Sequence, residues 1–205
     1  MNSPNTLPFS VVIPTYNRAD SIYPTLKSVQ NQTFSNFECL VVDDGSDDGA
    51  RLADVVASLE DRRFRYLRQQ NGGGGSARNA GIQAAKGRFI AFLDSDDLFL
   101  PEKLATFYAG IEPDEKYVAY YSKIKVDRGG RAYWVRPDRA IGQFEDMGEY
   151  LFVHNQYIQT STMIIPREVL THIPFDPHLR RGQDLDLCIR LARAGVRFKM
   201  INRPL

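Results

Sequence analysis

The sequence Arg88-Phe-Ile-Ala-Phe-Leu-Asp-Ser-Asp-Asp97 carries the clearest structural pattern in this chain of 205 residues. The run Phe89 to Leu93 is entirely apolar, and three carboxylates follow within the next four residues. A short apolar run bounded by polar residues indicates a buried β-strand. The strand is therefore expected to carry Asp94 to Asp97 at its carboxyl end.

Two earlier segments repeat this arrangement. The run Phe37 to Val42 ends in the acidic cluster Asp43 to Asp48, and the run Phe9 to Ile13 precedes the polar residues Thr15 to Arg18. In open α/β sheets, ligands bind in the crevice beyond the carboxyl ends of the strands. The three polar clusters are therefore predicted to converge on one site.

Helical periodicity separates these strands. Asp20 is expected to cap the first helix, and Pro101 is expected to open the fourth at its N1 position. The other predicted elements are a helix containing Leu52 to Leu59, a strand at Phe64 to Arg68, a loop at Gly72 to Gly75, a helix at Ser76 to Lys86, a short helix near Glu145 to Val153, a strand at Thr160 to Ile165, a helix at Gln183 to Ala194 and a strand at Val196 to Ile201. Strands that alternate with helices in this way must pair in parallel.

The alternation predicts an α/β fold, with one Rossmann-like domain over residues 1–205, a mixed and mostly parallel sheet, and helices on both faces. A hairpin adds antiparallel pairing, because Tyr117 to Val126 and Ala132 to Val135 flank the turn residues Arg128 to Gly130. The sequence stops at Asn202 to Leu205, directly after an apparent strand. We therefore expect the domain to be truncated at its C-terminal end and to continue in a longer protein.

Composition excludes several classes of protein. The formal net charge is +1, which gives no electrostatic case for a nucleic-acid partner. The longest apolar runs are about half a dozen residues, against the ~20 of a transmembrane helix, and the N-terminus lacks the features of a secretion signal. We therefore expect a cytoplasmic protein without a transmembrane segment. Cys39 and Cys188 lack any metal-binding spacing and are expected to be small buried residues.

The carboxylates of the Asp94 to Asp97 cluster should repel one another unless a cation lies between them. Mg²⁺ or Mn²⁺ is typically held by one or two carboxylates together with substrate phosphates. The cluster therefore favours a divalent cation and a phosphate-bearing ligand. The alternative is a structural role, in which the carboxylates form turns or cap helices. This role explains the Asp43 to Asp48 cluster equally well when that cluster is taken alone.

Five segments together resemble the family-2 glycosyltransferases with the GT-A fold. They are Phe9-Ser-Val-Val-Ile-Pro-Thr-Tyr-Asn-Arg18, Val41-Val-Asp-Asp-Gly-Ser46, Asn71-Gly-Gly-Gly-Gly-Ser-Ala-Arg-Asn-Ala-Gly81, Phe92-Leu-Asp-Ser-Asp-Asp97 and Gly182-Gln-Asp-Leu-Asp-Leu187. The resemblance implies an inverting transfer of a sugar from a nucleotide-diphosphate sugar to an acceptor hydroxyl, assisted by Mn²⁺ or Mg²⁺. Polysaccharide biosynthesis is the corresponding expected role.

The resemblance also implies the donor site. It places the nucleotide base and ribose on the residues matching Thr15, Tyr16, Asp43 and Asp44. It places the rest of the donor on the Asp-X-Asp motif formed by Asp94, Ser95 and Asp96, with the metal on Asp96. Arg78 follows the glycines near a helix start, where it is either a donor to the phosphates or an ordinary surface arginine.

The family's general base is the aspartate of a Glu-Asp pair near the start of a late helix. Here the pair is Gln183-Asp184, so the resemblance assigns the base to Asp184. The neutral Gln183 removes a like charge and argues against a raised pKa for Asp184. The alternative for Asp184 is a helix cap, and Asp186, on roughly the opposite helical side, is expected at the surface.

Other functions stay open at this level. The residues Gly72 to Ala77 formally satisfy a dinucleotide-binding fingerprint, although it falls in the third rather than the first βα turn. A nucleotidyltransferase or a non-catalytic nucleotide-sugar-binding module are further alternatives. The acceptor is a saccharide, a lipid-linked molecule or a protein, and peripheral association with the inner face of the membrane is compatible with the sequence.

Overall fold

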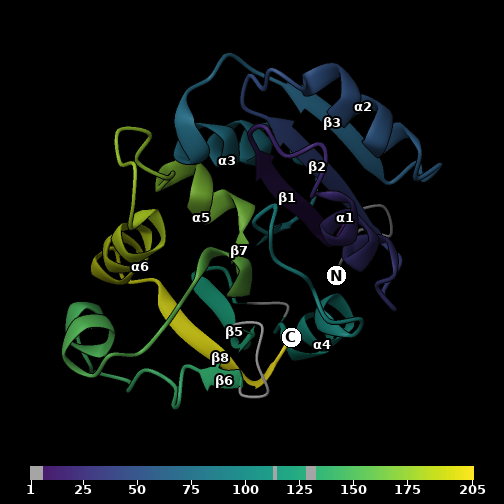
Figure 1. Ribbon diagram of the computed structural model, residues 1–205. Coiled ribbons are helices and arrows are strands. Elements are labelled where there is room, and N and C mark those ends of the chain that lie inside the picture. Colours follow the sequence, from purple (N-terminus) through teal and green to yellow (C-terminus); the bar gives the residue numbers. More distant parts are fainter. Residues whose placement is uncertain (1–6, 113–114, 128–132) are drawn as a thin grey trace.

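A computed structural model describes residues 7–112, 115–127 and 133–205 of the chain. Its described strands form one eight-stranded sheet with the order β3-β2-β1-β4-β7-β5-β6, while β8 pairs with β5 (Figure 1). The strands are β1 (Phe9–Thr15), β2 (Phe37–Asp43), β3 (Phe64–Arg68), β4 (Phe89–Phe92), β5 (Val118–Asp127), β6 (Tyr133–Arg136), β7 (Met163–Pro166) and β8 (Arg197–Pro204). The predicted α/β fold with a mixed sheet is confirmed.

The first four strands run parallel, as the alternation of strands and helices predicted. β1 is fully buried and lies between β2 and β4. Thr15 pairs in register with Asp43, so β1 and β2 end side by side. Because Val12 pairs with Phe92, β4 ends close to the same edge. The register thus brings together the three polar clusters that follow these strands.

The second half of the sheet contains the antiparallel pairs. β7 runs antiparallel to both β4 and β5, and β6 runs antiparallel to β5. The last of these pairs confirms the predicted hairpin, while its turn residues Arg128 to Gly130 lie outside the described residues. β8 returns to parallel pairing along β5.

Helices cover both faces of the sheet, and each face has its own hydrophobic core. On one face lie α1 (Tyr23–Gln30), α2 (Gly49–Ala57) and α4 (Lys103–Gly110), packed through residues such as Leu26, Leu52 and Phe107. On the other face lie α3 (Gly73–Ala84), α5 (Arg167–His172) and α6 (Gln183–Arg193), packed through residues such as Ile82 and Leu187. No helix within the described residues is both long enough and apolar enough to span a membrane.

Two helix starts differ from the prediction. Asp20 does not cap α1: Ile22 takes the N-cap position, and the Asp20 carboxylate accepts a hydrogen bond from Arg51 instead. A turn closed on the carbonyl of Arg18 separates Asp20 from the helix. Pro101 does not open α4, which begins at Lys103, because Pro101 lies in a turn whose carbonyl accepts the backbone N–H of Thr33.

Three further elements differ from the prediction. The residues Gly73 to Gly75 form the first turn of α3 rather than a loop. The segment Thr160–Thr162 forms a 3-10 turn (η2), so that β7 begins only at Met163, and the predicted short helix is a π-helix at Glu149–Val153 (η1). The six-residue helix α5 was not predicted, since so short a segment carries little periodicity.

Close packing of α3 on β1 depends on Gly81. A Cβ atom at this position would lie 2.4 Å from Cγ1 of Val12, a side chain buried at the centre of β1. Gly81→Ala should therefore lower the free energy of unfolding by about 1–3 kcal/mol, the usual effect of overpacking a core. Urea denaturation followed by circular dichroism measures this change.

Gly110→Ala is the matched control. It lies at the end of α4, where a new Cβ would meet only the flexible tip of Ile201 at 3.0 Å. Its effect on the free energy of unfolding should stay within about 1 kcal/mol, because alanine favours helices. Equal destabilisation by the two substitutions would contradict the packing argument.

Candidate active site

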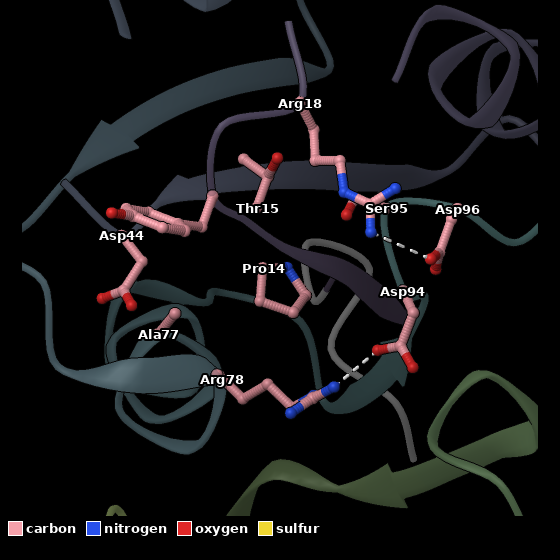
Figure 2. Close-up of a pocket in the computed structure, with 11 residues that line it drawn as sticks. Pro14, Thr15, Arg18, Asp44, Ala77, Arg78, Asp94, Ser95 and Asp96 are labelled. Carbon is pink, nitrogen blue, oxygen red and sulfur yellow. Dashed lines mark hydrogen bonds and ion pairs between the residues drawn. The ribbon is translucent and has the colours of Figure 1, made fainter. Parts of the chain in front are cut away.

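A cavity of about 260 Å³ lies at the carboxyl ends of β1, β2 and β4, and we refer to it as the strand-end cavity (Figure 2). Its lining comes from the end of β1, from the segments that follow β1, β2 and β4, and from helix α3. The lining residues are Pro14, Thr15, Tyr16, Arg18, Asp44, Gly74, Ala77, Arg78, Asp94, Ser95 and Asp96. The structure thus brings together every residue predicted to bind the donor except Asp43.

Arg18 was not among the predicted site residues, although it belongs to the polar cluster after β1. Its Nη2 lies 3.4 Å from Oδ2 of Asp96, and both side chains are exposed. Figure 2 shows the two side chains directed toward each other at the mouth of the cavity. A second missed feature is the backbone of α3, which contributes Gly74 and Ala77 to the lining.

The buried carboxylate of Asp44 holds the start of α3 beside the cavity. Its oxygens accept hydrogen bonds from the backbone N–H groups of Gly72 (2.9 Å) and Gly73 (2.7 Å). A carboxylate that accepts unpaired N–H groups stabilises the N-terminus of a helix. This contact across 28 residues explains why the helix begins among glycines, three residues earlier than the sequence pattern indicated.

Asp43 lies behind the cavity wall. Its carboxylate is fully buried and accepts hydrogen bonds from the backbone N–H of Ser46 (2.8 Å), the hydroxyl of Tyr66 and Nη1 of Arg68 (3.0 Å). Burial alone would raise the pKa of Asp43, but these hydrogen bonds and the Arg68 charge hold it below its usual value. The contacts fix the turn that carries Asp44 into the lining.

Arg78 connects the cavity to the late helix α6. It is only 8% exposed, so the alternative of an ordinary surface arginine is wrong. Its Nη2 lies 2.6 Å from Oδ1 of Asp94, and its Nη1 donates a 2.6 Å hydrogen bond to Oε1 of Gln183 (Figure 2 draws the first contact). The guanidinium therefore bridges the end of β4 and the first residue of α6.

Protein side chains offset part of the repulsion within the acidic cluster after β4, which we expected a cation to relieve. Asp94 pairs with Arg78, and Asp96 pairs with Arg18. The Asp97 carboxylate accepts hydrogen bonds from Oγ of Ser161 and Nε2 of Gln159. Burial, and then the neighbouring Asp94 and Asp96 charges, still raise the pKa of Asp97.

A metal ion would find few protein ligands here. Over the described residues, no three side chains of His, Cys, Asp or Glu converge as a metal site. The carboxylates that follow β4 and line the cavity are Asp94 and Asp96, and two carboxylates suit a divalent cation that takes its remaining ligands from phosphate and water. The site is therefore compatible with Mn²⁺ or Mg²⁺ only together with a phosphate ligand.

Two residues that line the cavity each carry a buried polar atom without a partner among the described residues. Oγ1 of Thr15 and Nε of Arg78 are buried and have no hydrogen-bond partner among the described residues. Buried polar atoms are nearly always hydrogen-bonded in native proteins.

Asp184 lies in the first turn of α6, beside the residue that contacts Arg78. It is not the N-cap, since Gly182 occupies that position with a φ of 66°. The half-buried carboxylate accepts the backbone N–H of Leu185 at 3.0 Å. Burial raises the pKa of Asp184, the charge of Asp94 adds to the increase, and the backbone hydrogen bonds and Arg78 oppose it.

We expected the neutral Gln183 to argue against a raised pKa for Asp184. The raised pKa of Asp184 corrects this expectation. Replacing a carboxylate by a neutral amide removes one like charge, but burial is the larger cause and remains. Asp186 lies elsewhere on the helix, where it pairs with Arg190 at 2.7 Å across one helical turn.

Both cysteines are buried and unpaired, and burial raises the pKa of each thiol.

The chain is similar in sequence to known proteins. The profile described as Glycosyl transferase family 2 matches residues 10–173. The chain is 38% identical over 205 residues to the amylovoran biosynthesis glycosyltransferase AmsB of Erwinia amylovora, covering 96% of this chain and 68% of AmsB.

Two solved structures have the same fold. The S. aureus TarS fragment 1–349 in complex with UDP-GlcNAc superposes with a TM-score of 0.72 at 28% identity, covering 95% of this chain and 56% of that one. The mannosyltransferase PcManGT from Pyrobaculum calidifontis, in complex with GDP-Man and Mn²⁺, has a TM-score of 0.69 at 20% identity, with 96% and 54% covered. The chain thus spans little more than half the length of these two solved chains.

Proposed function

The chain belongs to glycosyl transferase family 2 and has the GT-A fold, and from this premise we propose that it transfers a sugar from a nucleotide-diphosphate sugar to an acceptor hydroxyl with inversion. The observation that carries the proposal is the strand-end cavity, whose lining contains the ion pairs Arg18–Asp96 and Arg78–Asp94. The two ligand complexes named above contain UDP-GlcNAc and GDP-Man, which are donors of this class. Family membership also argues against a dinucleotide-binding role for the residues Gly72 to Ala77.

The phosphates of the donor have a natural place between the two ion pairs. Arg18 and Arg78 each pair directly with a carboxylate of the cavity lining, Asp96 and Asp94 respectively. A diphosphate would compete for the guanidinium groups, which bind phosphate oxygens in a fork geometry. The carboxylates released from the two arginines would then be the ligands for a divalent cation.

Asp96, with Asp94 beside it, would hold Mn²⁺ or Mg²⁺. When bound, such a cation offsets the negative charge that develops on the leaving diphosphate. Ser95 lies between the two carboxylates and lines the same cavity. Arg78 and Arg18 supply positive charge of their own to the diphosphate, independently of the metal.

The nucleoside end of the donor belongs at Thr15, Tyr16 and Asp44. Tyr16 is half exposed and offers an aromatic face, and the hydroxyl of Thr15 lacks a partner among the described residues. Asp43 acts indirectly in this proposal. Its buried carboxylate fixes the turn at Ser46 and the side chain of Arg68, and so positions Asp44.

Asp184 is the proposed general base. It takes the proton of the acceptor hydroxyl while that oxygen forms a bond to the anomeric carbon. The bond between that carbon and the diphosphate oxygen breaks on the opposite side, and the nucleoside diphosphate leaves. A carboxylate with a raised pKa suits this role, because proton transfer is favourable when the pKa of the base approaches the working pH.

The acceptor and the cellular place are also proposals. The name of AmsB connects that relative to polysaccharide biosynthesis, which supports a saccharide or lipid-linked acceptor over a protein. A cytoplasmic enzyme working at the inner face of the membrane would meet such an acceptor. Thermal shift with a panel of nucleotide sugars, with and without Mn²⁺, would identify the donor. Release of a nucleoside diphosphate rather than pyrophosphate would exclude a nucleotidyltransferase, and turnover would exclude a non-catalytic binding module.

Tyr16→Ala should weaken nucleoside diphosphate binding by about tenfold. A base stacked on an aromatic ring contributes roughly 1–3 kcal/mol, and the side chain of Tyr16 lines the cavity. Isothermal titration calorimetry with the nucleoside diphosphate of the identified donor and Mn²⁺ measures the change in affinity.

Tyr23→Ala is the control for Tyr16→Ala. Both tyrosines are 48% exposed, but Tyr23 lies at the start of α1 outside the cavity lining. Its replacement should leave the affinity unchanged. If Tyr16→Ala binds the nucleotide as tightly as the parent does, the base lies elsewhere.

A further inference from the structure

A second cavity of about 270 Å³ opens beside β6, and we refer to it as the aromatic cavity. Its lining consists of Trp134, Arg136, Asn155 and Tyr157, none of which lines the strand-end cavity. Two aromatic rings, a guanidinium group and an amide therefore share a hollow that the proposed donor site does not use.

The strand geometry of β6 turns two of these residues toward the cavity. Side chains alternate along a strand, so Trp134 and Arg136 share one face while Tyr133 lies on the other. On the cavity side, the ring of Trp134 meets the ring of Tyr157 edge-on, with centroids 6.3 Å apart and planes at 70°. The guanidinium carbon of Arg136 lies 5.6 Å from the Trp134 ring. The aromatic wall is thus formed before any ligand binds.

Asn155 lines the cavity from a loop that hydrogen bonds of the neighbouring Gln156 hold in place. Asn155 has a φ of +47°, in the left-handed region that asparagine tolerates better than most residues. The next side chain anchors this turn, because Gln156 accepts the backbone N–H of Asp138 at 2.8 Å and donates to the carbonyl of His154 at 2.9 Å.

The same loop continues directly to the acidic cluster of the proposed active site. Nε2 of Gln159 donates to Asp97 at 3.1 Å, and Oγ of Ser161 donates to the same carboxylate at 2.6 Å. Ser161 also accepts the backbone N–H of Asp94 at 3.0 Å. Tyr157 precedes Gln159 by two residues, so their Cα atoms lie within about 7 Å of each other.

Tyr157 also lies close to the proposed base. Burial raises the pKa of the Tyr157 hydroxyl, and the carboxylates of Asp184, Asp97 and Asp94 raise it further. Salt screens the interaction between exposed charges beyond about 10 Å. The charge of Asp184 therefore acts on a tyrosine that lines the aromatic cavity.

We propose that the aromatic cavity binds one pyranose ring of a saccharide acceptor and holds its reacting hydroxyl toward Asp184. A pyranose has an apolar C–H face and a rim of hydroxyl groups. The rings of Trp134 and Tyr157 match the face, and the N–H groups of Arg136 and Asn155 match the rim. The inference rests on the proposed glycosyl transfer and specifies its acceptor.

The volume and the charge of the aromatic cavity restrict the kind of sugar that it can bind. The cavity volume lies just below the range of about 300–1,000 Å³ that is typical of sites for drug-sized ligands, so a single ring fits better than an extended chain. Asp138 pairs with Arg136 and compensates its charge. A neutral sugar is therefore the expected occupant.

The test uses Trp134, the single tryptophan of the sequence, as an intrinsic fluorescent reporter. We titrate the protein with methyl glycosides of glucose, galactose, mannose and N-acetylglucosamine at millimolar concentrations. At least one glycoside should change the emission in a saturable way. Tyr157→Ala should weaken that response by about tenfold, whereas Tyr133→Ala, on the opposite face of β6, should leave it unchanged. A flat emission for all four glycosides, or an equal response in Tyr157→Ala, overturns the proposal.

Kinetics separate this proposal from the proposed function. Trp134→Ala should lose about tenfold in kcat/KM for the glycoside that gave the strongest response, while hydrolysis of the donor by water and its binding with Mn²⁺ stay unchanged. Loss of transfer and hydrolysis together would show that Trp134 supports the fold or the donor site and would overturn the acceptor assignment. Absence of donor binding in the parent protein would contradict the proposed function itself.

Discussion

Asp184→Asn should lower turnover by about 10²-fold or more while donor affinity stays near that of the parent. A positioned carboxylate base contributes roughly 10²–10⁴-fold to a proton-transfer step. Asparagine keeps the shape of the side chain and can still accept the backbone N–H of Leu185, which Asp184 now accepts at 3.0 Å. The helix should therefore stay in place while the proton acceptor is lost. Turnover with a surrogate glycoside and calorimetry with the donor measure the two quantities separately.

Asp186→Asn is the matched control for this substitution. Asp186 lies on the same helix and forms an ion pair with Arg190, so its replacement changes one half-exposed surface pair. Such pairs contribute at most about 1 kcal/mol to stability. Near-parental turnover of Asp184→Asn would refute its assignment as the base and make Asp186 the next candidate.

The pH dependence of kcat/KM provides a second control. The base must be deprotonated to act, so the rate should fall as the pH decreases through the raised pKa of Asp184. Asp97 also has a raised pKa and lies close by, bonded to Ser161. The acid limb should therefore persist in Asp97→Asn and disappear in the residual activity of Asp184→Asn.

The sequence was sufficient to predict the parallel half of the sheet and the meeting of the three polar clusters. Buried strands leave a direct trace in apolar runs such as Phe9 to Ile13, and parallel pairing fixes which strand ends meet. The position of α6 followed from an equally plain pattern, an amphipathic run that ends at Gly195. In both cases neighbouring residues decide the structure.

Contacts between distant residues decided the features that the sequence did not reveal. Whether Asp43 or Asp44 faces the cavity depends on Tyr66, Arg68 and the backbone of Gly73, which lie more than 20 residues away. The pairing of Arg18 with Asp96 spans 78 residues and changes the electrostatics of the acidic cluster. No local pattern encodes these pairs, so the repulsion argument for a cation left out the arginines that pair with Asp94 and Asp96.

Asp96→Ala should abolish the metal dependence of nucleoside diphosphate binding and lower turnover by at least about 10²-fold. The proposed cation offsets charge on the leaving diphosphate, an effect of several kcal/mol, and each 1.4 kcal/mol corresponds to about tenfold in rate. The fold should survive, because the Asp96 side chain is 59% exposed and its contact with Arg18 is a long surface ion pair. Calorimetry with Mn²⁺ and with excess chelator measures the metal dependence in parent and variant.

Asp20→Ala separates loss of the metal ligand from loss of a surface ion pair. Asp20 is also exposed and pairs with Arg51 at 2.6 Å, away from the cavity lining. It should retain the full difference between Mn²⁺ and chelator, while Asp96→Ala should bind the nucleotide equally under both conditions. Arg18 has no carboxylate partner at position 96 in the variant, so its charge is free for the diphosphate and should preserve part of the metal-independent affinity. If the parent protein binds the nucleoside diphosphate equally well in chelator and in Mn²⁺, the metal assignment fails, and the two arginines alone account for recognition of the phosphates.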